Sequence, residues 1–223
     1  MCIRDSNPFL GRRGLRLSLQ QPDIFKQQLR ALVRAGMQHP ITVLFPMVTT
    51  IDELRAARAL LAEAAVEVGC AAGDLPPGFE VGAMAEVPAF ALHARAAVPL
   101  VDLISIGTND LTQYTLAAER GNAGVAGLAD PLDPAVLYLI SEVADAATAR
   151  ARVAVCGELA ADPIAAALLI GLGVRELSMT PRAIPAVKDA VRSMSANKTK
   201  QLAALALHRD SAASVRALLS DLA

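Results

Sequence analysis

The chain contains no tryptophan, and aromatic residues make up only 3% of its 223 positions. This scarcity argues against a base-stacking platform for single-stranded nucleic acid and against an aromatic sugar-binding cleft. Neither sign of charge is in excess, since 21 basic and 22 acidic residues give a formal net charge of −1. The composition therefore gives no electrostatic reason to expect nucleic acid or an acidic membrane surface as a partner.

Cysteine is scarce as well. Cys2, Cys70 and Cys156 are odd in number and far apart, so the sequence shows neither a disulfide framework nor a zinc site. This usage suits a reducing compartment. The longest stretch without a formal charge, residues 35–51, is too short and too polar for a membrane span. Because no apolar segment follows a basic start, we expect a cytoplasmic protein that does not insert into membranes.

Apolar residues, in contrast, make up 54% of the chain, enough for a large core. The first six residues carry no periodicity, and we interpret residues 1–6 as a non-native leader. Beyond them short apolar runs alternate with longer helical patterns, which indicates a parallel α/β sheet. The expected strands cover residues 15–19, 41–45, 81–85, 101–106, 153–155 and 176–179, and the expected helices cover residues 22–35, 50–69, 88–97, 111–118, 134–150, 163–172 and 184–194.

Two local patterns support these assignments. The run ITVLF at residues 41–45 is continuous and β-branched, as is typical of a strand buried on both faces. Thr50 precedes the next helical pattern, and Glu53 follows it three residues later. This spacing predicts a capping box at the start of that helix.

The placement of polar residues decides between two parallel folds. A doubly wound sheet would carry a glycine-rich phosphate loop after its first strand, and the sequence has none. Polar residues instead follow the ends of several strands, as on the active-site rim of a (β/α)8 TIM-type barrel, which has eight strands. The chain shows about six β/α units. We therefore expect a truncated (β/α)8 barrel over residues 7–194 and a helical tail over residues 195–223.

Two carboxylates follow neighbouring strands directly. Glu86 ends the segment GAMAE, and Asp110 ends LISIGTND. Since adjacent strand ends are neighbours in a barrel, both side chains would point into one mouth and could hold Mg²⁺, with the other positions left to water and substrate. Each acid could equally well cap the helix that follows it, where negative charge is favoured. The spacing alone leaves both readings open.

The segment around Asp110 also predicts an anion site. Asn109 and Asp110 open a helix whose first N–H groups could bind phosphate. Arg120 follows ten residues later and could return to that phosphate through a bidentate contact. A basic cluster near the first expected strand includes Arg13. For both arginines, a solvated surface position is the simpler interpretation.

Cys156 ends the apolar run VAVC. Most cysteines in strands are small buried apolar residues. Its place at a barrel rim raises the alternative of a proton donor or nucleophile. The three histidines show no metal-binding spacing, and we assign them no role, which removes histidine as a general base or phosphoryl carrier within the chain.

Several of these residues lie within longer segments that occur in a fixed order. The segments are NPFLGRRGLRL, LFPMVTT, EVGAMAEVPA, SIGTNDLTQYTLAAERGN, DPLDPAVL, VCGELAADP and ELSMTP. Together they resemble the C-terminal phosphoenolpyruvate-binding barrel of enzyme I of the bacterial sugar phosphotransferase system. Pyruvate phosphate dikinase and phosphoenolpyruvate synthase share the GTND segment after an E-x-P segment, whereas QYTLAAERGN favours enzyme I.

The resemblance implies a role for each candidate. Glu86 and Asp110 would be the Mg²⁺ ligands. Cys156 would protonate the methylene carbon of enolpyruvate to give pyruvate. The residues that hold the substrate would be Arg13, Asn109, Asp110 and Arg120.

The resemblance also implies partners. In that family, phosphate passes from phosphoenolpyruvate to a histidine on an N-terminal domain and then to the phosphocarrier protein HPr, as the first step of sugar uptake. This chain lacks that domain and two upstream barrel strands. We therefore expect that this chain by itself is inactive as an enzyme and either folds poorly or oligomerises. Because the family barrel dimerises, we expect the whole protein to be a homodimer.

Three other interpretations remain open. The chain could be a dikinase or synthase barrel that uses ATP. It could be an Mg²⁺-dependent aldolase or lyase acting on pyruvate. It could also be a non-catalytic module that binds phosphoenolpyruvate and dimerises.

Overall fold

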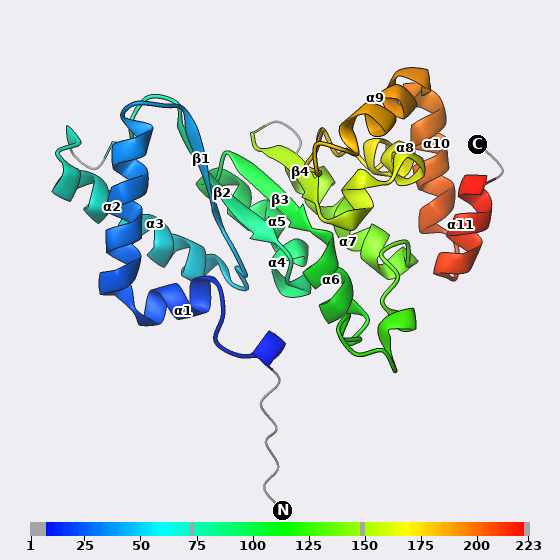
Figure 1. Ribbon diagram of the computed structural model, residues 1–223, viewed down its shortest axis with the longest axis horizontal. Helices are drawn as coiled ribbons and strands as arrows, with labels where there is room; N and C mark the ends of the chain where they lie inside the picture. Colours follow the sequence, from blue (N-terminus) through cyan, green and yellow to red (C-terminus); the bar gives the residue numbers. More distant parts are fainter. Residues whose placement is uncertain (1–7, 72–73, 148–149, 221–223) are drawn as a thin grey trace, which may run out of the picture.

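The computed structural model describes residues 8–71, 74–147 and 150–220. The proposed leader at residues 1–6 lies outside them. Five parallel strands form one sheet in the order β1-β2-β3-β4-β5, so each strand pairs with the next one along the chain (Figure 1). The strands are β1 (Ile41–Phe45), β2 (Phe79–Ala85), β3 (Leu103–Gly107), β4 (Arg152–Cys156) and β5 (Glu176–Leu177).

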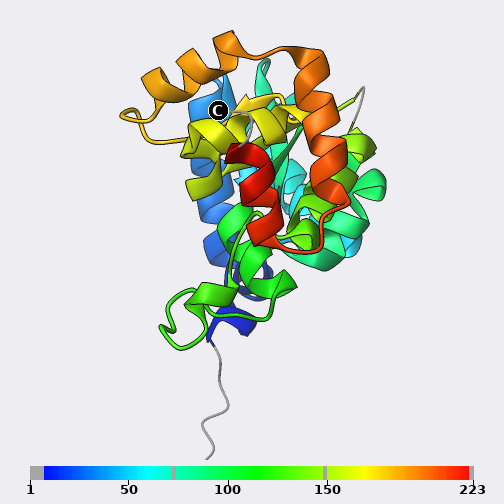
Figure 2. The ribbon, with the colours of Figure 1, turned by 90° about the vertical axis from the view of Figure 1, so that its right-hand side faces the viewer.

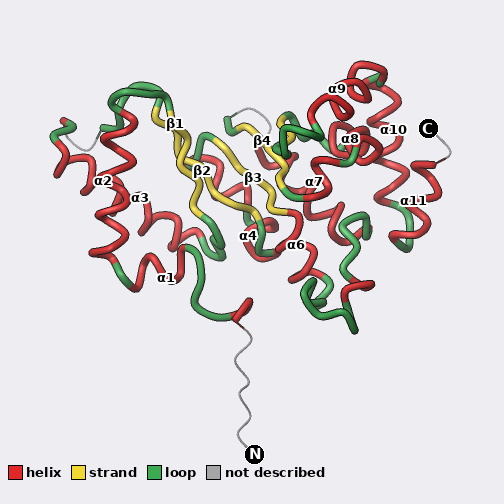
Figure 3. Tube along the Cα trace, viewed as in Figure 1, coloured by secondary structure: helices red, strands yellow, loops and turns green. Residues whose placement is uncertain are grey.

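Helices connect the strands and flank the sheet, which runs through the middle of the molecule (Figure 3). The α-helices are α1 (Leu15–Gln20), α2 (Pro22–Gly36), α3 (Ile51–Val68), α4 (Pro88–Leu92), α5 (Ala94–Ala97), α6 (Thr108–Thr115), α7 (Pro134–Ala147), α8 (Pro163–Gly171), α9 (Ile184–Ser193), α10 (Ala196–Leu207) and α11 (Ala212–Ser220). Short 3₁₀ turns include η1 (Pro8–Leu10) and η5 (Glu158–Ala161).

The sheet confirms the parallel α/β class, whereas a barrel is not confirmed. Among the described residues, β1 pairs only with β2 and β5 only with β4, so the sheet is open at both edges. Closing a TIM-type barrel takes eight strands. The five described strands follow one another in the sheet in the order in which they occur along the chain.

The expected strand at residues 15–19 is wrong, because this segment is helix α1. Its sequence LRLSL alternates apolar and polar residues, as an exposed strand does. The same letters also place Leu15 and Leu19 four residues apart on one face of a helix. Leu15 is fully buried and Leu19 packs against the core, while Leu17 is 42% exposed. Burial of the i, i+4 pair decides in favour of the helix.

The expectation that residues 41–45 are buried on both faces is also wrong. In β1, Val43 and Phe45 are buried, while Thr42 and Leu44 on the opposite face are exposed. The register places Glu80 beside Thr42 and Gly82 beside Leu44. One face of the sheet thus packs on helices, and at β1 the other face has no covering layer among the described residues.

The capping box at the start of α3 is confirmed. The Thr50 side chain accepts the Glu53 backbone N–H, and the Glu53 carboxylate accepts the Thr50 N–H in return. These two bonds satisfy N–H groups that the helix leaves without partners. They fix the start of α3 directly after the loop that ends β1.

The last helices pack onto the α/β core rather than extending away from it (Figure 2). Helix α10 lies against α8 so closely that a Cβ atom on Gly171 would lie 2.0 Å from the Thr199 carbonyl oxygen. Leu202 and Ala206 of α10 and Leu219 of α11 are buried in this contact region and belong to the main core. In the part of the chain that the structure describes, no helix is long and apolar enough to span a membrane.

Candidate active site

The carboxyl ends of β2, β3 and β4 meet at one edge of the sheet. The register pairs Ala85 with Ile106 and Gly107 with Cys156. Glu86 therefore lies beside the end of β3, where a Cβ atom on Gly107 would be 2.8 Å from Glu86 Oε2. Glycine at this position lets the carboxyl group lie across the strand end. The structure thus brings together the groups that the sequence placed at neighbouring strand ends.

Glu86 is the buried acid of this edge, with 7% of its surface exposed. Its Oε1 accepts the backbone N–H of Met47 at 2.6 Å. Burial raises the pKa of Glu86, the Met47 N–H lowers it, and the charge of Asp110 raises it again. Arg13 and Arg120 act in the opposite direction. A cation beside this carboxyl group would offset the cost of its burial.

Met47 and Gly14 build the loop that holds Glu86. Met47 has φ 55°, in the left-handed region that residues other than glycine rarely adopt. The Leu15 N–H donates to the Pro46 carbonyl at 3.0 Å, which fastens the start of α1 to this loop. Gly14 has φ 54°, and a Cβ atom there would lie 2.8 Å from Met47 Cβ. The N-terminal segment therefore supports the loop that supplies the N–H to Glu86.

Replacing Gly14 by alanine is expected to lower the free energy of unfolding by about 1–3 kcal/mol. The alanine backbone would be held at a strained positive φ, and its methyl group would press on Met47. Gly69→Ala is the matched control, because Gly69 also has positive φ, at 103°, but nothing lies within 4 Å of the added carbon. Guanidinium unfolding curves would compare the two variants, and equal losses of stability would show that the contact with Met47 contributes nothing.

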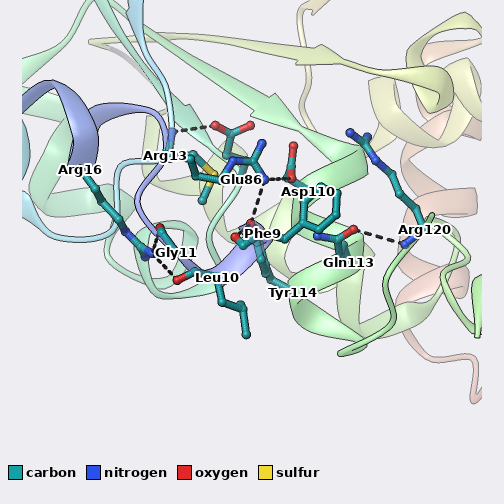
Figure 4. A network of polar contacts seen from close by, with 11 residues as sticks. Phe9, Leu10, Gly11, Arg13, Arg16, Glu86, Asp110, Gln113, Tyr114 and Arg120 are labelled. Carbon is teal, nitrogen blue, oxygen red and sulfur yellow. Dashed lines mark hydrogen bonds and ion pairs between the residues drawn. The ribbon is translucent and has the colours of Figure 1, made fainter. Parts of the chain in front are cut away.

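Asp110 is the second acid and is bound by Arg13. Arg13 Nη1 lies 3.0 Å from Asp110 Oδ1, and the carboxylate side chain is 13% exposed. The same Nη1 donates to the Tyr114 hydroxyl at 3.1 Å, and that hydroxyl donates to the Phe9 carbonyl. The Arg13 guanidinium also lies over the Phe9 ring, 5.5 Å from its centre (Figure 4). A network of polar contacts thus joins η1, the start of α1 and helix α6.

Neither acid acts as a helix cap. Helix α4 has Val87 at its N-cap without a side-chain cap, and Glu86 bonds to the loop after β1 instead. Helix α6 has Gly107 at its N-cap, also without a side-chain cap. Asp110 lies in the first turn of α6 and pairs with Arg13. A side-chain cap hydrogen bond is thus seen for neither acid, while the shared metal site stays a prediction.

Asn109 and Arg120 lie on either side of Asp110 in the sequence and reach the same region. Asn109 is half-buried in the first turn of α6, and its Oδ1 would be 3.1 Å from a Cβ atom on Gly157. Arg120 is exposed in the loop after α6, where its backbone N–H donates to Gln113 Oε1 at 3.2 Å. In Figure 4 its side chain extends on the opposite side of Asp110 from Arg13. Two arginines therefore lie on either side of Asp110.

Cys156 brings a thiol to this edge. Its Sγ lies 3.6 Å from Ser105 Oγ and 3.5 Å from the Ile106 carbonyl oxygen. Burial raises the pKa of the Cys156 thiol, the Ser105 hydroxyl lowers it, and the charges of Glu86 and Asp110 raise it further. The thiol is therefore held protonated at neutral pH. This state suits a proton donor and disfavours a nucleophilic thiolate.

The oxygen donors at this edge of the sheet are of the kind that magnesium prefers. Among the described residues, no group of three or more histidine, cysteine or acidic side chains gathers as a metal site. Magnesium, however, is commonly bound by one or two carboxylates together with water and substrate phosphate. Glu86 and Asp110 supply two carboxylates whose charges are close enough to affect each other. The pair fits such an ion if the substrate completes the coordination.

Four contributors to the site were not singled out from the sequence. They are the Met47 backbone, Ser105, Thr108 and Tyr114. Thr108 is fully buried and donates to the Cys156 carbonyl at 2.9 Å, which fixes the end of β4 against α6. Only Ser105 left a signal in the sequence, since it is the single polar side chain within the buried run LISIG.

Comparison with known proteins identifies the family. The family described as "PEP-utilising enzyme, PEP-binding domain" matches residues 2–196, which is most of the chain. The chain belongs to this family. The PEP-binding family assignment agrees with the resemblance derived from the seven ordered segments.

Curated relatives carry the names of phosphotransferases. The chain is 48% identical to the multiphosphoryl transfer protein of Xanthomonas campestris pv. campestris, over 96% of this chain and 25% of that protein. It is 44% identical to the phosphoenolpyruvate-protein phosphotransferase of Geobacillus stearothermophilus, over 89% of this chain and 35% of that protein. It is 38% identical to the phosphoenolpyruvate-protein phosphotransferase of Haemophilus influenzae, over 98% of this chain and 38% of that protein. The chain therefore spans between a quarter and two fifths of the length of these relatives.

A solved structure shows the same kind of fold. A citrate lyase from Burkholderia xenovorans LB400 superposes with a TM-score of 0.56, over 88% of this chain and 67% of that chain. The sequence identity is 17%, so the similarity concerns the fold alone.

Proposed function

We propose that this chain is the phosphoenolpyruvate-binding portion of a phosphoenolpyruvate–protein phosphotransferase. One observation carries the proposal: a pair of acids, two flanking arginines and a protonated thiol share one edge of the sheet. Phosphoenolpyruvate has a phosphate and a carboxylate, which need positive charge, and a methylene carbon, which must receive a proton. The family and the names of the relatives support the same substrate.

Each residue has a task in this proposal. Asn109 and the first N–H groups of α6 hold the phosphate, because a helix leaves its first N–H groups without internal partners. Arg13 and Arg120 add charge-assisted contacts on either side. A magnesium ion held by Glu86 and Asp110 would supply Lewis-acid stabilisation of the developing negative charge. The barrel residues thus position and neutralise the substrate, which is what phosphoryl transfer mainly requires.

The chemical step releases pyruvate. The bond from phosphorus to the enol oxygen breaks as a bond forms to a nitrogen of a histidine on another domain. The resulting enolate takes a proton at its methylene carbon from Cys156 Sγ, which leaves a thiolate that regains a proton from solvent. In the whole protein the phosphate then passes to the phosphocarrier protein HPr. We propose that the protein acts in the cytoplasm and as a homodimer, with the open sheet completed to a (β/α)8 barrel.

Phosphoenolpyruvate binding tests this function. Isothermal titration of the chain is expected to show saturable binding with Mg²⁺, weakened at least about tenfold when EDTA replaces the metal. ATP and pyruvate serve as comparison ligands. A chain that is folded by circular dichroism but does not bind millimolar phosphoenolpyruvate would contradict the proposal.

The alternatives predict different results. A dikinase or synthase would need ATP to move phosphate, so transfer to HPr by the whole protein without ATP would exclude both. A pyruvate aldolase or lyase has no use for Asn109, Arg120 or a proton donor at Cys156. A non-catalytic binding module would bind phosphoenolpyruvate and dimerise without forming pyruvate.

A further inference from the structure

Tyr114 lies one helical turn after Asp110 on the same face of α6, since the two are four residues apart. Both bind the same atom, Arg13 Nη1, at 3.1 Å from the hydroxyl and 3.0 Å from Asp110 Oδ1. The Tyr114 hydroxyl uses its single proton to donate to the carbonyl of Phe9. It therefore links two points of the N-terminal segment, one on the backbone and one on a side chain, to the rigid helix of the site.

The packing around this segment is otherwise loose. Leu10 is 65% exposed. A cavity of about 400 Å³ lies between η1 and the region after α6, lined in part by Phe9, Leu10, Gln113, Tyr114 and Ala118. Apolar contacts therefore fill this region incompletely. The polar contacts that join residues 8–13 to α6 are the Arg13–Asp110 ion pair and the two contacts of the Tyr114 hydroxyl.

We propose that Tyr114 is a positioning residue whose hydroxyl holds Arg13 ready for the substrate phosphate by tying it to the Phe9 carbonyl. This inference rests on the proposed function and deepens it. A long arginine side chain loses rotamer freedom when it is ordered, and a contact that orders it beforehand reduces the cost of binding. Arg13 Nη1 donates both to Asp110 and to Tyr114. If Asp110 bound a metal ion and released Arg13, the contact with Tyr114 would remain. Arg13 then stays at the site while Asp110 takes part in ion binding.

Tyr114→Phe is the test, because it removes only the hydroxyl. Tyr138→Phe is the matched control: Tyr138 is 52% exposed on α7, and its hydroxyl has no hydrogen bond to any residue that the structure describes. Phosphoenolpyruvate affinity in Mg²⁺ is expected to fall about tenfold in Tyr114→Phe, the order for one hydrogen bond to a charged group, and not in the control. In an Arg13→Ala background, Tyr114→Phe is expected to weaken binding by less than twofold.

A second readout needs no substrate. Trypsin cleavage after Arg13, followed by mass spectrometry of the folded chain, reports how firmly the guanidinium is held. Cleavage is expected to be several-fold faster in Tyr114→Phe than in the wild type and in Tyr138→Phe.

The two readouts separate the two proposals. Faster cleavage in Tyr114→Phe with no phosphoenolpyruvate binding by the wild-type chain would support the hold of the Tyr114 hydroxyl on Arg13 and refute the proposed function. Unchanged affinity and cleavage in Tyr114→Phe, with normal wild-type binding, would refute the positioning role alone. A further tenfold loss in the Arg13→Ala background would also refute it, because the hydroxyl would then act independently of Arg13.

Discussion

Replacing Cys156 by alanine is expected to slow pyruvate formation by about 10²–10⁴-fold, the range for loss of a general acid. Binding of phosphoenolpyruvate should be retained, because in the proposed mechanism the thiol acts on the methylene carbon and not on the phosphate. The measurement requires a phosphotransferase that contains this segment together with its histidine domain. Pyruvate release would be followed alongside titration of phosphoenolpyruvate binding.

Cys70→Ala is the matched control for this variant. Cys70 follows helix α3 and packs against the core, and its thiol has no part in the proposed site. Undiminished pyruvate formation in Cys156→Ala would remove the thiol from the mechanism. Equal losses in both variants would indicate damage to the fold.

The thiol also sets a pH dependence. Because its pKa is raised by burial and by the nearby acids, the protonated form persists above the ordinary cysteine range. Only that form can donate a proton, so pyruvate formation should fall as the pH rises through the raised pKa. Buffers that favour the thiolate would at the same time speed alkylation of Cys156 by iodoacetamide.

The sequence predicted all five strands of the sheet, and for β1 to β4 the signal was an apolar run followed by polar residues, whereas β5 is only the pair Glu176–Leu177. It also predicted that Glu86 and Asp110 would be neighbours, since consecutive parallel strands end at the same edge. Helix α1 was assigned wrongly because LRLSL fits both a strand and a short amphipathic helix, and only the burial of Leu15 separates them. For so short a segment the pattern does not decide between a covered strand face with Leu15, Leu17 and Leu19 and a covered helix face with Leu15 and Leu19.

Contacts across long sequence separations were not predictable. Tyr114 is 105 residues from the Phe9 carbonyl that it binds, and Met47 is 39 residues from Glu86. Such pairs depend on how the N-terminal segment and the loop after β1 are placed in the fold. The Met47 contact, moreover, comes from a backbone N–H, which any residue except proline could supply.

Glu86→Gln is expected to abolish activity and to stabilise the fold. Removing a group that is hydrogen-bonded to a metal ligand lowers metal affinity or activity by about 10–100-fold. Removing the ligand itself should therefore lower turnover at least about 100-fold. The buried glutamine keeps an oxygen to accept the Met47 N–H but has no charge to desolvate. Its melting temperature at neutral pH should therefore rise, by about 2–4 °C for a gain on the order of 1 kcal/mol.

The pH dependence of this gain identifies its cause. The folded chain holds a proton on Glu86 more tightly than the unfolded chain, because the pKa of Glu86 is raised. The free energy of unfolding of the wild type therefore falls as the pH rises from the ordinary glutamate value, about 4.3, through the raised one. The free energy of unfolding of Glu86→Gln should not decrease in this pH range, because glutamine does not ionise. The two proteins should therefore converge in stability below about pH 4 and differ most above the raised pKa. Glu63→Gln, at a side chain 57% exposed on α3, should show no such divergence. If the free energies of unfolding of Glu86→Gln and the wild type differ by the same amount at every pH, burial of the charged carboxylate does not destabilise the fold, which would contradict this prediction.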